Sequence, residues 1–261
     1  MTISKNNSCK TILLLFGSFA IGYNVAVALH ELGHAVAMWV TGGQVERITL
    51  NPFSTSYTHY ASKSIYPIFT SVAGLAFGTI FAVLLLVMAG LLRKQYLVLL
   101  LLVTTIVAGI QNGLYAIVDS LVSGGGDATY LIELGVSQSV IIGIGVLLVG
   151  SSIVLAVLGL RFIVFQTNDS LSKRILLLEA GMLPYLIGLV VYQVICDTKK
   201  LGLYSTYAFI AAALILIIAI LSRLPLGRRY NAHILDSIGW GTTWMTVVVG
   251  IAIVVGELYW F

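Results

Sequence analysis

The sequence predicts an all-α polytopic membrane protein with about seven transmembrane helices and a short membrane-associated β-hairpin or loop after the first. Hydrophobic residues make up 59% of the 261-residue chain and charged residues only 9%, about a third of the share that is usual in a soluble domain. The mean hydropathy is +1.03. Too few polar side chains remain to cover a water-soluble globule, which excludes intrinsic disorder and an ordinary soluble enzyme. The apolar runs are continuous rather than alternating, so a transmembrane β-barrel is also excluded.

Stretches that are long enough to cross a bilayer recur along the whole chain. A helix needs about 20 residues to cross a hydrocarbon core about 30 Å thick. The stretches that meet this length are residues 11–40, 66–92, 95–122, 138–163, 174–196, 203–222 and 241–259. The first resembles a signal peptide at its start, but its apolar pattern continues through Val40, so we expect it to be retained. The connections are short, and we therefore expect residues 1–261 to form a single membrane domain.

Charge and cysteine content restrict the partners and the kinds of site. The net charge of +4 is spread over short loops instead of forming a basic patch, so we expect no nucleic-acid partner. The two cysteines, Cys9 and Cys196, are too few for a disulfide framework or a cysteine-based zinc site. The lipid bilayer is the partner that the composition implies.

The loop after the first stretch has an unusual composition. Thr41-Gly42-Gly43 is a helix-stop signal. Segments 44–50 and 53–60, on either side of Asn51-Pro52, contain Val, Ile, Thr and Tyr residues that favour extended strands. We therefore expect a short β-hairpin that lies on or dips into the membrane, where its open edge must be covered by protein or by a wet cavity. An irregular surface loop is the alternative.

The most informative motif, His30-Glu31-Leu32-Gly33-His34, stands at the end of the first stretch. Helix positions i and i+4 share a face, so His30 and His34 can present two imidazoles to one metal ion. Glu31 lies beside them, where its carboxylate can take a proton from a water molecule. This HExxH spacing is typical of zinc hydrolases. Ionisable residues inside a membrane helix are costly and usually functional, although three hydrated side chains at the membrane interface are the alternative.

Two histidines do not complete a catalytic zinc site, which usually has three protein ligands and an open position. The other histidines, His59 and His233, fall in the hairpin and in a basic loop. Asp119 and Asp127 stand at the end of the third stretch, which lies on the same membrane face as the end of the first. We predict Asp127 as the third ligand because glycines 124–126 give its backbone freedom, with Asp119 as the alternative. Asp127 could instead cap the helix that follows it.

These residues resemble the site-2 protease family (M50-type) of intramembrane zinc metalloproteases. The 30–34 motif in a membrane helix resembles the family's first signature, and residues 41–48 resemble the turn and strand that follow it. Residues 73–76, Ala-Gly-Leu-Ala, are similar to a small-residue stretch in the family's next core span. The resemblance extends over residues 20–135.

The third-ligand signature is less regular. Gly126-Asp127-Ala128 resembles family members in which a small residue precedes the ligand Asp. Asn112 and Asp119 match the commoner Asn…Asp pattern only loosely, because its Pro and the Gly after its Asp are missing.

The resemblance implies a zinc endopeptidase that acts in regulated intramembrane proteolysis. One Zn²⁺ per chain would be bound by His30, His34 and Asp127, and Glu31 would be the general base. The substrate would be a transmembrane protein, and the enzyme an integral multi-pass protein of a prokaryotic cell membrane. Residues 11–135 would form the metalloprotease-like core, and residues 136–261 would add transmembrane helices.

The alternative function is that of a non-catalytic metal-binding membrane protein, either a transporter or a pseudoprotease that binds transmembrane helices. Metal binding alone would not need a carboxylate at Glu31, which argues against a pseudoprotease. A transporter would carry ionisable residues along several spans, and the later stretches have few.

Overall fold

The computed structural model describes residues 5–53, 56–92, 95–121, 126–164, 170–196, 201–222 and 238–260. The helices are α1 (Lys5–Val40), α2 (Pro67–Leu92), α3 (Gln95–Leu121), α4 (Asp127–Glu133), α5 (Gln138–Ile163), α6 (Leu171–Cys196), α7 (Leu201–Leu221) and α9 (Trp240–Trp260), and the strands are β1 (Val45–Thr49) and β2 (Tyr57–Tyr60). Among the described residues, 6 helices are long and apolar enough to cross a membrane, and α7 adds the apolar segment Phe209–Leu221. The predicted all-α polytopic membrane fold is confirmed.

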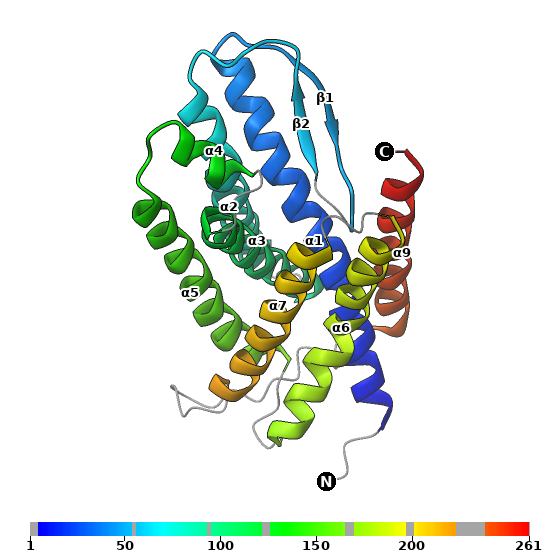
Figure 1. The fold of residues 1–261 in the computed structure, drawn as a ribbon. Coiled ribbons are helices and arrows are strands. Elements are labelled where there is room, and N and C mark those ends of the chain that lie inside the picture. The colour runs from blue at the N-terminus through cyan, green and yellow to red at the C-terminus, as the bar shows by residue number, and fades with distance from the viewer. Residues whose placement is uncertain are drawn as a thin grey trace.

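Helix α1 runs through the bundle and packs against α2, α3, α6 and α9 (Figure 1). Its 36 residues correspond to a length of about 54 Å, more than a hydrocarbon core requires. It ends at the predicted stop signal, where Gly42 adopts a left-handed φ of 78° and the Gly43 amide donates to the carbonyl of Met38 at 2.8 Å. Glycine tolerates this conformation without strain, as expected at a helix C-terminus.

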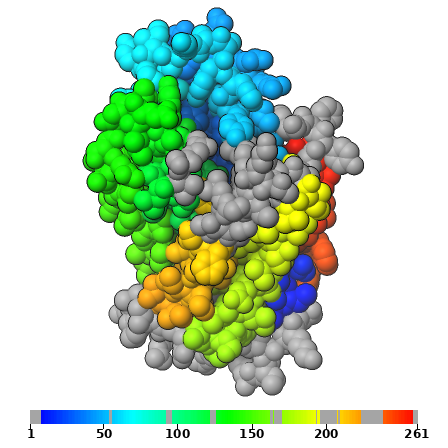
Figure 2. Space-filling model, in the orientation of Figure 1, coloured from blue at the N-terminus to red at the C-terminus, as the bar shows by residue number. Residues whose placement is uncertain are grey.

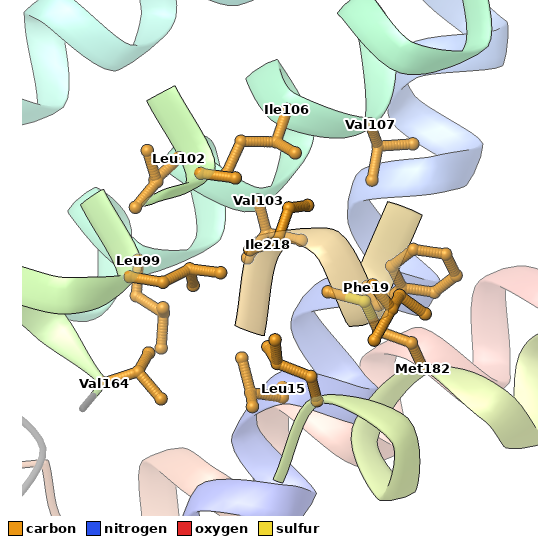
Figure 3. Packing of buried hydrophobic residues seen from close by; sticks show 14 of the residues in the cluster. Leu15, Phe19, Leu99, Leu102, Val103, Ile106, Val107, Val164, Met182 and Ile218 are labelled. Carbon is orange, nitrogen blue, oxygen red and sulfur yellow. The ribbon is translucent and has the colours of Figure 1, made fainter. Parts of the chain in front are cut away.

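The largest apolar core lies between α1 and the helices α3, α5, α6 and α7. Figure 3 shows Leu15 and Phe19 of α1, Val103 and Ile106 of α3 and Ile218 of α7 as members of this core, with Val103 and Ile218 next to each other at its centre. This packing fixes the N-terminal part of α1, from Leu14 to Ala26, against four other helices. The C-terminal part of α1, which carries the 30–34 motif, therefore has a rigid support.

The loop after α1 is a two-stranded antiparallel hairpin, so the predicted strands are confirmed and the irregular loop is excluded. Ile48 pairs with Thr58 and Thr49 with Tyr57, and the register shifts between Val45 and Arg47. The hairpin folds back along α1, and together with α4 it lies at the end of the bundle away from the N-terminus (Figure 1).

The turn of the hairpin docks on α6. The Tyr185 hydroxyl donates to the Pro52 carbonyl at 2.7 Å, and the Asn51 side-chain amide donates to the Tyr192 hydroxyl at 3.3 Å. The Phe53 ring lies 5.2 Å from the Tyr185 ring between centroids. The hairpin is therefore held at both ends, by α1 at its base and by α6 at its turn.

Candidate metal centre

The structure brings the side chains of His30 and His34 on α1 together with Asp127, the first residue of α4. Asp127 Oδ2 lies 3.0 Å from His30 Nε2 and 2.9 Å from His34 Nε2, and the two Nε2 atoms are 3.2 Å apart. Both histidines are buried, with 4% of each exposed, while the Asp127 side chain keeps 28% exposure. One nitrogen from each imidazole and one carboxylate oxygen therefore converge on one point.

The outer nitrogens of the two imidazoles are held by acceptors. His30 Nδ1 lies 2.9 Å from Asn112 Oδ1, and His34 Nδ1 lies 2.8 Å from the carbonyl oxygen of Thr70. Oxygens of these types accept hydrogen bonds only, so both Nδ1 atoms carry the hydrogen and each neutral ring keeps a lone pair on Nε2. Three acceptor atoms then face one another, an arrangement that a bound cation would stabilise.

The orientation of the Asn112 amide follows from its other contacts. Its Nδ2 donates to Thr79 Oγ1 at 3.0 Å and lies 3.3 Å from the carbonyl oxygen of Leu75. The side chain is almost completely buried, with 1% exposed. The amide oxygen is thereby turned toward His30, and α2 and α3 together fix the ring orientation of the first histidine.

The donor set also fits zinc in size. Tetrahedral ligand atoms at about 2.0–2.1 Å from a zinc ion are about 3.3 Å from one another. The separations here, between 2.9 and 3.2 Å, are slightly shorter, so a small outward movement of the side chains is enough. Two imidazole nitrogens and one carboxylate oxygen are among the donor sets that catalytic zinc sites use.

Asp127 does not cap α4. Gly126 is the N-cap residue, with φ of 151° and no side-chain cap hydrogen bond, and the Asp127 side chain points to the histidines instead. Burial opposes ionisation of Asp127, but when His34 and His30 are protonated their charges and hydrogen bonds outweigh it and hold the pKa of this carboxyl below its ordinary value. The site thus favours the ionised carboxylate, which is the form that binds a cation.

The alternative residues take other places. Asp119 Oδ1 accepts a hydrogen bond from the Tyr207 hydroxyl of α7 at 2.7 Å. Its carboxyl group lines the cavity that contains the histidines but does not join their ligand cluster. His59 on β2 instead lies 3.1 Å from Thr49 Oγ1. His233 lies outside the described residues, as do glycines 124 and 125.

Glu31 is buried, with 6% exposed, and the hairpin holds its carboxyl group. Thr58 Oγ1 lies 2.9 Å from both Glu31 Oε2 and the Glu31 carbonyl oxygen. Tyr60 is two residues further along β2 and therefore faces the same side of the strand. Burial, and then the negative charges of Asp127 and Glu31, raise the pKa of Tyr60 above its ordinary value. Its hydroxyl thus stays protonated and available as a donor.

A cavity of about 970 Å³ surrounds these side chains. It is lined by His30, Glu31, His34 and Asp127, together with the β2 side of the hairpin and residues of α2, α3 and α7. The hollow is visible in Figure 2 between the hairpin (cyan) and α4 (green), with α1 (blue) at its base. Its volume is at the upper end of the range for ligand pockets, so it has room for a segment of peptide.

A glycine on α2 makes space for the second histidine. A Cβ atom added to Gly74 would overlap the imidazole of His34 at Nε2. Gly33 plays a similar part on α1, because its Cβ would lie 2.5 Å from the carbonyl oxygen of Ala73. The two helices approach closely here through small residues.

We expect Gly74→Ala to lower the metal content of the purified protein, because the added methyl group displaces the His34 ring from Asp127. Gly90→Ala is the matched control, since Gly90 lies on the same helix and has nothing within 4 Å of its added Cβ. Metal analysis of both variants by mass spectrometry tests this. Equal metal content in the two variants would contradict the assigned position of His34.

Comparison with known proteins gives a family but no individual relative. No match was found among curated proteins or among solved structures. The sequence matches the family described as Peptidase M50B-like over residues 12–170, a range that runs from α1 through α5 and includes all the residues of the candidate metal centre. Because this match covers more than half of the chain and agrees with the site-2 protease (M50) resemblance of the motifs, the protein belongs to the Peptidase M50B-like family of membrane metallopeptidases.

Proposed function

We propose that the protein is an intramembrane zinc endopeptidase that hydrolyses peptide bonds of membrane-spanning proteins, in the cell membrane of a prokaryote. The observation that carries this proposal is the convergence of His30, His34 and Asp127 in a cavity that Glu31 also lines. In this site His30, His34 and Asp127 would hold the zinc ion, which when bound supplies the Lewis acidity that activates water at neutral pH.

Glu31 is the general base in this proposal. Its carboxylate takes a proton from the attacking water and later gives a proton to the leaving amine nitrogen. The hydrogen bond from Thr58 at 2.9 Å holds the carboxylate in one orientation. The protonated Tyr60 hydroxyl lines the same cavity and can donate to an oxygen of the substrate.

The substrate segment must unwind before it is cut, because a helix shields its carbonyl groups in intrahelical hydrogen bonds. Strand β2 offers a place for the unwound segment. The Ala61 amide donates to the Gln44 carbonyl at 2.9 Å, so the main-chain groups of Ala61 point toward β1. Main-chain direction alternates along a strand, so the N–H and C=O groups of Thr58 and Tyr60 point to the open edge. A peptide added to this edge would lie along the cavity that contains Glu31.

Metal analysis tests the proposed centre. We expect one zinc ion per chain in the purified protein and none in the His30→Ala, His34→Ala double variant, because two of the three ligands are removed. His59→Ala is the matched control, since this histidine contacts Thr49 on the hairpin and should leave the zinc content unchanged. Retention of zinc by the double variant would overturn the proposed centre.

A further inference from the structure

A second cavity lies deeper in the bundle, between α1, α3, α5, α6 and α7. Its volume is about 110 Å³, and its lining is almost entirely apolar. Figure 3 shows six of its lining residues in the core: Phe19, Val103, Ile106, Val107, Met182 and Ile218. A water molecule would find few hydrogen-bond partners there, so the cavity suits an apolar group.

This apolar cavity adjoins the metal centre. Gln111, Tyr115 and Tyr207 line both the apolar cavity and the larger polar one. The Tyr115 ring meets the His30 ring edge-on, with 5.8 Å between centroids. A group bound beside His30 is therefore within reach of the entrance to the apolar cavity.

Gln111, at this entrance, has an unused hydrogen-bond acceptor. The residue is buried, with 8% exposed, and its Nε2 donates to the Tyr115 hydroxyl at 3.1 Å. Its Oε1 is fully buried and has no hydrogen-bond partner among the described residues. A buried acceptor without a partner is costly, so a ligand N–H group that reaches Gln111 Oε1 would relieve this cost.

We propose that this cavity is a specificity pocket for one branched aliphatic side chain of the substrate, of the size of leucine, next to the bond that is cut. Gln111 Oε1 accepts a hydrogen bond from a main-chain N–H of the same substrate segment. The inference rests on the function proposed above and adds a substrate preference to it.

The volume selects the size of the side chain. An apolar protein cavity of about 150 Å³ holds benzene, with six carbon atoms. A cavity of about 110 Å³ therefore holds about four carbon atoms in proportion. This matches the isobutyl group of leucine, whereas a methyl group leaves most of the cavity empty and an indole exceeds it.

The test uses small zinc-binding probes, so that it does not depend on a known substrate or on catalysis. N-acylated leucine hydroxamate and alanine hydroxamate carry the same metal-binding group and differ only in the side chain. We expect the zinc-loaded protein to bind the leucine compound about 10- to 200-fold more tightly, the range that small changes in apolar side chains produce in enzyme pockets. The dissociation constants are measured by ligand-dependent thermal unfolding.

Two substitutions on α7 provide a matched pair. Ala211 lines the apolar cavity, so Ala211→Phe should fill it and remove the leucine preference. Ala213 is exposed on the same helix, and Ala213→Phe should keep the preference. Gln111→Met should weaken the binding of both hydroxamates to the same extent. Methionine removes the acceptor for the main-chain N–H of the ligand, while its similar size keeps the shape of the pocket.

A further substitution on α7 should produce a gain of binding, which misfolding cannot produce. Leu214 lines the cavity and is buried, so Leu214→Ala should enlarge it and shift the preference toward phenylalanine hydroxamate.

Equal binding of the leucine and alanine compounds to the unmodified protein would overturn the pocket while leaving the metal centre in place. Binding of neither compound would overturn the metal centre, and the pocket with it. A lipid acyl chain that remains bound through purification and is lost only from Ala211→Phe would also overturn the inference, because it names a different occupant.

Discussion

Glu31→Gln is expected to lower the cleavage of membrane-spanning substrates by about 10²- to 10⁴-fold, the usual contribution of general acid–base catalysis. Glutamine keeps the shape of the side chain and can still accept the hydrogen bond from Thr58, but it cannot take up a proton. The variant should therefore retain its zinc and its folded yield. The assay is co-expression with a library of tagged single-span membrane proteins, in which fragments produced with the unmodified protein are compared with those produced with Glu31→Gln.

Two results would argue against this assignment. If no substrate in the library distinguishes the two proteins, the protease proposal loses its support and a non-catalytic metal-binding function gains. If Glu31→Gln loses its zinc, Glu31 supports the metal centre directly and its role as general base is wrong. Thr58→Val is a useful companion variant, because it leaves the carboxyl group in place and removes only the hydroxyl group that orients it.

Asp127→Ala is expected to lower the zinc affinity far more than Asp119→Ala. Loss of a residue that only supports a metal ligand typically costs about 10- to 100-fold in affinity, so loss of a ligand should exceed about 100-fold on the same scale. Asp127 Oδ2 lies within 3.0 Å of both histidines, whereas Asp119 is hydrogen bonded to Tyr207. Zinc titration of the metal-free variants against a chelator of known affinity gives both values.

Asp119→Asn is the matched control for this comparison, because asparagine still accepts the hydrogen bond from Tyr207 without carrying a charge. We expect its zinc affinity to stay close to that of the unmodified protein. A larger loss in Asp119→Ala than in Asp127→Ala would assign the role of third ligand to Asp119.

The parts of the centre that lie within one helix could be predicted from the sequence. The i, i+4 spacing of His30 and His34 fixes their relative position through helix geometry alone, and a helix also places Glu31 beside them. Membrane spans and the hairpin followed in the same way from local composition and length. The choice between Asp119 and Asp127 depends on where the chain turns after α3, and local spacing does not encode this.

The residues that the sequence did not reveal act across helices. Thr70 holds His34 through its main-chain carbonyl, which any residue type would supply, so its side chain carries no signal. Thr58 and Tyr207 come from the hairpin and from α7, and only the tertiary fold brings them to Glu31 and Asp119. Asn112 is the exception, since it belongs to the loose Asn…Asp pattern that the sequence shows, and the structure places its amide oxygen against His30.

The docking of the hairpin turn on Tyr185 and Tyr192 has a thermodynamic consequence for substrate capture. A hairpin with a free turn would fluctuate, and each incoming segment would have to immobilise it as well as itself. Here Asn51 and Pro52 contact α6. The conformational entropy of the hairpin is therefore lost when the protein folds, and not when a substrate binds. Preorganisation of this kind strengthens binding without adding any contact to the ligand. Under the proposed function, helix α6, which follows the family-matched segment 12–170, would therefore contribute to substrate affinity from outside the metal centre, by keeping strand β2 in place before a substrate arrives.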